Sequence, residues 1–460
     1  MKKWILSCIL AAFSLIGYGQ IFVSEGVEMA INQALHKDVE LRNQSLEQKK
    51  MALEHKAVLQ KYIPRVEANA LYGYLHSQAN LDLPPLKLPL TGLTLFNGST
   101  DFSAEGQAFH GGITAKMVLF SGGQIPNGAK ALQEKNQGQI YMMALRKDEV
   151  LQDLLQSFDQ LELLKTAEVL INDSDKRLAK EAERVQKAIA LGLAIPYDRD
   201  KIKLARLELE TKRADVHNKQ QLLALKINQL TGLETDEILS IQHQVTPIVI
   251  LSTLDTENRN EIKALESFQK ASEYAIKKEK GAYLPTLGAF AGYSYSSLFN
   301  AETQVPIGAL NTTTHLKMNH LTLHPSFMVG VAMKWEIFSG FERLHKVEEA
   351  ELNAQQIANK LADAKEKMKL QLLKNQAEYE TMLHQIDIAE QREKIAQNNN
   401  ILAEKQYRNG LIGITERLAA ENDTYKEALN KMETIINERK AAIETYKAAG
   451  ILQESINSTL

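Results

Sequence analysis

The sequence predicts a duplicated chain of mixed α and transmembrane β class, in which a helix-strand-strand-helix-helix unit occurs twice. Three observations lead to this prediction. The two halves of the 460-residue chain match each other, which is the mark of an internal repeat. Apolar residues recur at every second position after one proline in each half, as they do in strands. Elsewhere the apolar residues step by three and four, as they do in helices.

The duplication keeps its register over a long distance. Tyr62-Ile63-Pro64 recurs as Tyr283-Leu284-Pro285, an offset of 221 (283 minus 62). From Lys116 onward the offset is 218 (338 minus 120). It holds for four pairs: Lys116 with Lys334, Phe120-Ser121-Gly122 with Phe338-Ser339-Gly340, Gly192 with Gly410, and Gly232 with Gly450. The offset changes by only three residues between the Tyr-x-Pro and the Phe-Ser-Gly sequences, so chance does not explain the match.

Residues 1–19 form a predicted secretory signal. Two lysines precede an apolar run at 4–16, and the sequence Gly17-Tyr18-Gly19 follows it. We expect cleavage after the small residue Gly19. The run is too short to span a membrane stably. The single cysteine, Cys8, lies within this segment, so the exported chain should carry neither a disulfide nor a lipid anchor.

Composition and motifs exclude several classes of function. The net charge of −3 gives no basic surface for nucleic acid. No later run reaches 18 apolar residues, so an exported chain of this kind is either soluble or crosses a membrane as strands. The chain contains no Gly-x-Ser-x-Gly, no His-Glu-x-x-His and no phosphate-binding glycine loop. We therefore expect neither enzyme activity nor a cofactor.

Strands are predicted at about 64–77 and 111–121 in the first repeat, and at about 285–297 and 327–338 in the second. Each has apolar residues on one face and small or polar residues on the other, and about ten residues suffice to cross a bilayer at a tilt. A soluble sheet with one buried face is the alternative. The attached helices are too polar to cover such a face, so lipid-facing strands are the preferred interpretation.

Residues 78–110 and 298–325 are predicted to be long surface loops, which face the outside in bacterial outer-membrane barrels. Lys116 and Lys334 are expected to face the lumen of a barrel, or alternatively to snorkel near its periplasmic rim. His315, His320 and His324 in the second loop are the best metal candidates, but their spacing fits no zinc signature. No metal site is predicted.

Long helices are predicted at about 123–190 and 341–408, and return helices at about 196–231 and 414–449. A narrow apolar seam on a charged helix requires partner helices alongside. Gly192 and Gly410 should form the turns, and Gly232 and Gly450 should cap the return helices. The predicted divisions are a signal at 1–19, a first repeat at 20–233, an inter-repeat equatorial segment at 234–257, a second repeat at 258–452 and a tail at 453–460.

Four strands cannot close a barrel, and an open strand edge in lipid leaves backbone groups without partners. Identical subunits must therefore join to close the sheet. Physical reasoning alone leaves two, three or four subunits open.

The order of elements resembles the TolC family of outer-membrane efflux proteins over almost the whole chain. The resemblance rests on the landmarks where the chain enters and leaves the strands (Pro64, Pro285, Gly122 and Gly340) and on the turns between long and return helices. It implies a homotrimer with a 12-stranded outer-membrane β-barrel, continuous with a long periplasmic α-helical barrel. It also implies an exit duct in the outer membrane of a Gram-negative bacterium, serving tripartite efflux or type I secretion. The implied partners are a periplasmic adaptor (membrane fusion) protein, an inner-membrane RND or ABC transporter, and outer-membrane lipid.

The family's turn motif places an acidic residue six positions after the glycine. The matching pairs here are Gly192 with Asp198 and Gly410 with Glu416. Some members have a second acidic residue three positions later, where this chain has Lys201 and Ala419, so a double acidic ring is not implied. One hypothesis is that three Glu416 side chains form a cation-attracting ring at a closed tip. The alternative is a solvated carboxylate that favours the helix dipole.

Two other functions have less support in the sequence. A soluble periplasmic coiled-coil adaptor or chaperone would explain the signal and helices but not the alternating strands. An exported hydrolase has no supporting motif.

Overall fold

The computed structural model describes residues 21–82, 84–92, 94–96, 99–250, 253–307 and 312–458. The predicted signal with Cys8 lies outside these residues. The chain divides into a helical unit (Met1–Met51, Glu134–Lys270 and Gln355–Leu460) and a sheet unit (Ala52–Gln133 and Ala271–Ala354). None of the helices among the described residues has the length and apolar character needed to span a membrane.

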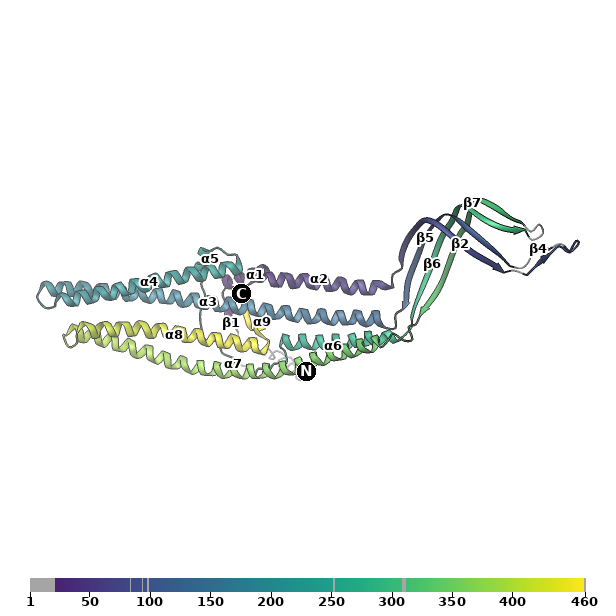
Figure 1. Ribbon diagram of the computed structural model, residues 1–460. Coiled ribbons are helices and arrows are strands. Elements are labelled where there is room, and N and C mark those ends of the chain that lie inside the picture. The colour runs from purple at the N-terminus through teal and green to yellow at the C-terminus, as the bar shows by residue number, and fades with distance from the viewer. Residues whose placement is uncertain are drawn as a thin grey trace, which may run out of the picture. The chain divides into compact units, whose positions relative to one another are not determined.

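The sheet unit contains one four-stranded antiparallel sheet, in the order β2 (Arg65–Asp82), β5 (Ser99–Phe120), β6 (Thr286–Ile307) and β7 (Thr312–Lys334) (Figure 1). The central pair, β5 and β6, joins the two repeats. A small hairpin of β3 (Leu86–Lys87) and β4 (Thr94–Phe96) forms a separate pair. On their outer edges, β2 and β7 have no partner among the described strands.

The strands are longer than predicted on the side of the loops. The prediction that 78–110 and 298–325 are loops is wrong for most of their length, because β2 pairs with β5 as far as Asp82 and Ser99 and β6 pairs with β7 as far as Ile307 and Thr312. The Pro, Gly and Asn residues there are weak strand formers. Pairing with a neighbouring strand satisfies their backbone groups and overrides that preference.

The other end of the fourth strand is shorter than predicted. It ends at Lys334 rather than near 338. The next residue, Trp335, instead donates its indole N–H to the carbonyl of Tyr283 at 3.2 Å.

The strand register separates two chemically different faces. Directly opposed residues share a face, and the row Val66, Ala115, Ala291 and Val329 belongs to an apolar face. The row Glu67, Thr114, Gly292 and Met328 belongs to the opposite, more polar face. On the apolar face Val329 is 68% exposed. This face is therefore uncovered within the single chain.

The helices in chain order are α1 (Glu25–Lys37), α2 (Val39–Leu59), α3 (Gln124–Ala190), α4 (Pro196–Thr231), α5 (Thr235–Ser240), α6 (Asn260–Lys280), α7 (Glu342–Arg408), α8 (Ile414–Ala449) and α9 (Leu452–Ser455), with short 3-10 turns at Gln60–Tyr62 and Gly281–Tyr283. The long and return helices begin within one residue of their predicted starts. The helices α1 and α2 meet at Asp38, whose carboxylate accepts the Leu41 amide at 2.8 Å. This side chain caps the second helix.

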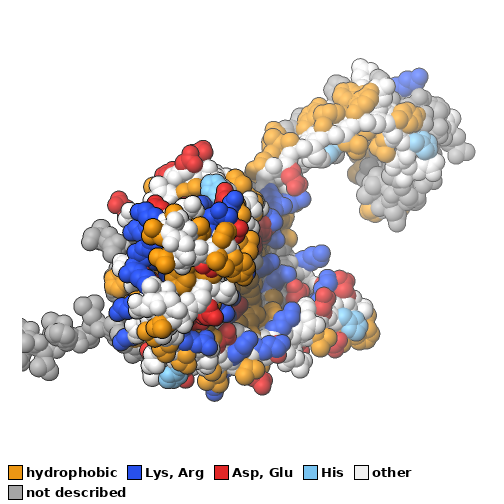
Figure 2. Space-filling model, turned by 90° about the vertical axis from the view of Figure 1, so that its left-hand side faces the viewer, with side chains coloured by type: hydrophobic (Ala, Val, Ile, Leu, Met, Phe, Trp, Pro, Cys, Tyr) orange, Lys and Arg blue, Asp and Glu red, His pale blue; other side chains and the backbone are white. Residues whose placement is uncertain are grey.

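In the helical unit α4 runs back along α3, and α8 runs back along α7 (Figure 1). Figure 2 shows basic and acidic side chains spread among hydrophobic ones over this unit. The return helices end at Gly232 and Gly450, which have φ values of +87° and +76°. Left-handed backbone of this kind favours glycine.

The segment predicted as a C-terminal tail at 453–460 contains most of α9 and all of β8 (Ile456–Ser458). After α9, β8 pairs in parallel with β1 (Ile21–Val23). Ile21 and Val23 are buried in the main apolar core of the helical unit, together with Leu154, Phe158 and Tyr446. The core therefore holds both ends of the described chain.

A buried ionic cluster lies in this core and joins the repeats. Asp159 of α3 accepts hydrogen bonds from Arg439 of α8 at 3.0 and 3.1 Å. His243, in the inter-repeat segment, contacts the same carboxylate at 2.7 Å, and Arg439 also donates to the carbonyl of Thr246 at 2.8 Å. Removing one partner of such a buried pair typically costs about 3–5 kcal/mol, because the other charge is left uncompensated.

A second acid, Glu438, is fully buried beside this pair and accepts the amide of Ile248 at 3.1 Å. Burial raises the pKa of Glu438 to about 7, while the Ile248 amide and Arg439 act in the opposite direction and the charge of Asp159 adds to the rise. The Tyr379 hydroxyl lies nearby and donates to the carbonyl of Ile248 at 2.8 Å. The inter-repeat segment is therefore fixed to α7 and α8 by a site that prefers a protonated carboxyl.

Replacing Glu438 with Gln should make the helical unit less sensitive to pH. Because the pKa of Glu438 is higher in the folded chain than its usual 4.5, the folded state binds more protons between these values. The group's stabilising effect is then present at low pH and lost as pH rises through about 7. At pH 8 the free energy of unfolding of the Glu438→Gln protein should be higher than that of the wild type by on the order of 3 kcal/mol. Near pH 4.5 the difference should be much smaller. Thermal unfolding of the detergent-purified protein from pH 4.5 to 8 measures this difference.

The control is Glu433→Gln, which alters an exposed acid on the same helix. A stability difference between wild type and Glu438→Gln that stays constant with pH would contradict the assignment.

Candidate functional site at the helical turns

The two turns that join long and return helices have the same geometry. Gly192 and Gly410 have φ values of +73° and +71°. The Leu193 amide donates to Ala188 at 2.8 Å and the Gly192 amide to Ile189 at 3.0 Å; in the second turn, Leu411 and Gly410 donate to Gln406 and Tyr407 at 2.9 and 3.0 Å. This pattern of two backbone hydrogen bonds is the Schellman motif, whose left-handed residue favours glycine. The glycines identified by the sequence repeat therefore form the turns.

The two predicted acidic residues lie in the first turns of the return helices, with different surroundings. Asp198 is half-buried in α4, whereas Glu416 is exposed in α8. Within the described part of the chain, Glu416 has no hydrogen bond or ion pair. A carboxylate in either position favours the positive end of the helix dipole.

Asp198 lies close to the second repeat. Burial raises the pKa of Tyr407 in α7 to about 12, and the charges of Asp198 and Glu181 add to the rise. The structure therefore brings Asp198 near the second turn.

A second polar network between the repeats, near the turns, was not predicted from the sequence. Glu421 of α8, nearly buried, accepts hydrogen bonds from Ser174 Oγ at 3.1 Å and Arg177 Nε at 2.7 Å, both on α3. Its other oxygen accepts from Asn400 of α7 at 3.1 Å and Arg417 at 3.3 Å. One carboxylate thus connects three helices.

Arg417 completes this network. It is only 3% exposed and donates to the Asn400 side chain at 2.7 Å. In the sequence, Arg417 and Glu421 form an i, i+4 pair, a spacing typical of exposed ion pairs on a helix surface. The signal that could have identified them is their position between Ile414, Leu418 and Tyr425, on the face that packs against the first repeat.

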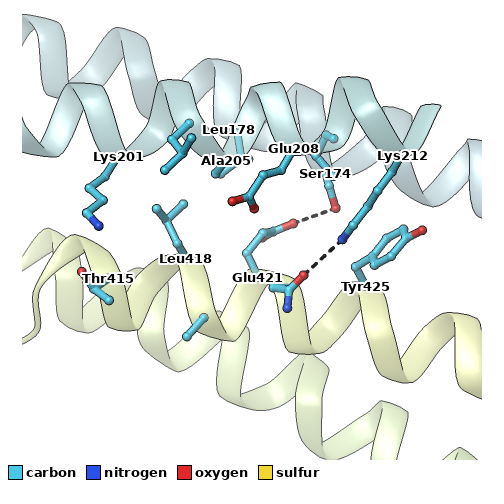
Figure 3. Close-up of a pocket in the computed structure, with 14 residues that line it drawn as sticks. Ser174, Leu178, Lys201, Ala205, Glu208, Lys212, Thr415, Leu418, Glu421 and Tyr425 are labelled. Atoms are coloured by element: carbon cyan, nitrogen blue, oxygen red, sulfur yellow. Dashed lines mark hydrogen bonds between the residues drawn. The ribbon is translucent and has the colours of Figure 1, made fainter. Parts of the chain in front are cut away.

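A groove of about 310 Å³ adjoins this network, between α4 and α8 (Figure 3). Leu178, Ala205 and Leu418 supply apolar surface, while Lys201, Glu208 and Lys212 supply charge. The Lys212 ammonium lies 4.5 Å from the Tyr425 ring centre and donates to Asn422 at 3.4 Å. An apolar surface with a polar rim is suited to docking another protein.

The four landmark residues of the sheet all lie at junctions between helical segments and strands. Pro64 and Pro285 each lie between a 3-10 turn and a strand. Gly122 and Gly340 have φ values of +64° and +62°. A Cβ at Gly122 would lie 2.3 Å from the carbonyl oxygen of Gly281, so a larger residue could not fit without moving the backbone. The exit of the first strand pair is therefore packed against the entry of the second.

Lys116 and Lys334 both lie on the more polar face of the sheet. Lys116 is directly opposite Arg65 and Phe290, and Lys334 is directly opposite Thr286. Both lysines are exposed in the single chain.

No group of three or more His, Cys, Asp or Glu residues suited to a metal ion occurs among the described residues. The side chains of His315, His320 and His324 lie outside the described part of the structure.

Replacing Glu421 with Ala should loosen the helices near the turns. Arg417 would remain buried without its counter-charge, which is a large local cost for a site of this kind. Amides of α8 around residues 414–425 should then exchange with deuterium about tenfold faster or more, because local opening becomes easier. Hydrogen–deuterium exchange with mass spectrometry measures this.

Glu416→Ala is the matched control, since it removes an exposed acid from the same helix. Equal exchange rates in wild type and Glu421→Ala would show that the network does not hold these helices together.

The family model described as outer membrane efflux protein matches residues 252–450. No curated protein matches the chain.

Three solved structures illustrate the similarity of fold. The Campylobacter jejuni CmeC outer membrane channel has a TM-score of 0.69 and 14% identity, covering 93% of this chain and 86% of its own. A CusC structure has a TM-score of 0.72 and 15% identity, covering 95% and 96%. The Neisseria gonorrhoeae MtrE outer membrane channel has a TM-score of 0.66 and 15% identity, covering 92% and 88%.

The predicted outer-membrane efflux function and location agree with the matched family, and nothing in the comparisons favours the soluble periplasmic alternative. The family is a transport family, not a family of enzymes. The predicted resemblance to TolC-like outer-membrane efflux proteins is thereby confirmed, by sequence over the second repeat and by fold over almost the whole chain.

Proposed function

We propose that this chain is one subunit of an outer-membrane exit duct, which passes substrates from an inner-membrane pump across the periplasm and the outer membrane. The observation that carries the proposal is the four-stranded sheet, with its exposed apolar face and two unpaired edges. Lipid can cover the apolar face, but only other strands can satisfy the edges. Tripartite efflux and type I secretion both fit this role.

A homotrimer satisfies these edges. Three copies of a four-stranded sheet give the 12-stranded barrel that the family resemblance implies, with β7 of one subunit pairing with β2 of the next. The more polar face, with its glycines at 288, 292 and 330, would then line the lumen. The long and return helices of three subunits would form the periplasmic helical barrel.

The groove between α4 and α8 supports a partner assignment. Its apolar floor and charged rim suit a helical segment of a periplasmic adaptor (membrane fusion) protein, which would connect the channel to an inner-membrane RND or ABC transporter. A soluble periplasmic adaptor or chaperone could also use this groove, but that function would give the exposed apolar face of the sheet no role.

The channel assignment is tested by placing a charge on either face of the same strand. Val329 and Met328 are neighbours with similar exposure, 68% and 63%, but they lie on opposite faces of the sheet. Val329→Lys should reduce the amount of trimer in the outer membrane several-fold, because a lysine facing lipid costs about 2–4 kcal/mol at mid-bilayer. Met328→Lys should assemble normally.

The measurement is the heat-modifiable oligomer extracted from envelopes with detergent, together with conductance steps in planar bilayers. A monomer that stays in the soluble periplasmic fraction, or equal assembly of both variants, would overturn the proposal.

For the turns, we propose that three exposed Glu416 side chains form a cation-attracting ring at the closed end of the duct. Glu416→Ala should lower cation selectivity in planar bilayers and weaken block by divalent cations, since a ring of three carboxylates is removed. Thr415→Ala is a neutral control one position earlier. Unchanged selectivity and unchanged cation block would leave the helix-dipole role as the explanation of this residue.

A further inference from the structure

The sheet unit carries a concentration of positive charge that the transport assignment does not explain. Two overlapping hollows of about 540 Å³ and about 480 Å³ lie at one end of the sheet. At this end β2 and β6 begin and β5 and β7 end. Lys61, Arg65 and Lys116 line the first, and Lys61, Lys278 and Lys334 line the second. We call these five residues the basic cluster. None of the residues that line either hollow is an Asp or Glu.

The ladder positions of the cluster do not suit a purely structural role. Arg65 and Lys116 are directly opposed on β2 and β5, and like charges in that arrangement destabilise a sheet. Lys334 shares their face. Within the described residues none of these three forms an ion pair, whereas Lys278 pairs with Glu279 at 2.7 Å.

The acidic residues nearby do not neutralise the cluster. Glu67 is on the same face, opposite Thr114, and it makes no ion pair with Arg65 or Lys116 in the described structure. Glu336 follows the end of β7. The strands' more polar face therefore carries three described cations, Arg65, Lys116 and Lys334, against the single acid Glu67.

Two further features leave the cations accessible. Gly288 lines both hollows and provides no side chain to fill them. The first turn of α3 lines the second hollow with Gln124 and Ile125, and the Ser121 hydroxyl accepts the Ile125 amide at 3.2 Å. The positive end of that helix dipole adds to the field of the lysines.

We propose that the basic cluster is an anion-selecting site in the lumen, through which the duct favours solutes that carry carboxylate, sulfate or phosphate groups. This inference rests on the proposed trimeric channel, in which three copies of the cluster form one ring. Charges focused inside a low-dielectric wall raise the local concentration of oppositely charged solutes. The cluster would thus define a chemical class of substrate.

The test is block of the channel current by inorganic tripolyphosphate, a small multivalent anion, in planar bilayers made of zwitterionic lipid. Wild-type channels should be blocked. For the double variant Lys116→Gln with Lys334→Gln, the tripolyphosphate concentration that gives half-block should rise about tenfold or more. Lys116→Arg with Lys334→Arg keeps the charge and should retain the block. Lys374→Gln, which alters an exposed lysine of α7 in the helical unit, is the control outside the cluster.

A second arm distinguishes soluble anions from lipid headgroups. Adding anionic lipid to the bilayer should leave the tripolyphosphate block unchanged if the cluster faces the lumen. Weaker block in anionic lipid would show that headgroups occupy the cluster and would overturn the proposal.

Equal block of wild type and the Gln variant would also overturn it, and so would wild-type channels that are not blocked. Failure of the channel assignment itself looks different, since no conductance steps and no heat-modifiable oligomer would then appear for any variant.

Discussion

The two unpaired edges of the four-stranded sheet are the constraint on which the rest of this structure depends. Backbone groups along β2 and β7 have no partner within the described strands, and an apolar solvent offers none. The exposed apolar face makes contact between this face of the sheet and water unfavourable. Under the proposed function, assembly of subunits would therefore be the condition under which the sheet is stable. In the proposed trimer the duplication follows the same logic, because the two strand pairs of one subunit would supply a third of the barrel.

The helical unit solves a different problem. Its helices have narrow apolar seams, and buried polar groups supplement the apolar clusters that join the repeats. Asp159 and Arg439 join α3 to α8 within the main core, and Glu421 joins α3, α7 and α8 near the turns. Buried ion pairs contribute little net stability, but they impose a large cost on any misaligned packing. Charges of this kind suit helices whose regular surfaces would otherwise slide past one another.

These two solutions place the chemistry of the chain in different units. The sheet unit presents positive charge on its more polar face, at Arg65, Lys116 and Lys334. The helical unit presents an exposed acid at Glu416 and a groove whose rim mixes both signs. In the proposed duct, Arg65, Lys116 and Lys334 would attract anions and Glu416 would attract cations. Such fields would discriminate by charge without a tight binding site.

The sequence by itself determined the repeat, the long helices and the turns. Gly192, Gly410, Gly232 and Gly450 could be assigned from one chain, because a left-handed backbone position restricts the residue locally and the repeat shows it twice. The alternation after Pro64 and Pro285 likewise predicted the strands. Only the tertiary structure decided how far those strands continue and what joins the repeats. Pairing with neighbouring strands includes weak strand formers in the sheet. Glu421 accepts a hydrogen bond from Ser174, which is 247 positions away in the sequence. Contacts between distant segments depend on how helices pack, and no local pattern records that.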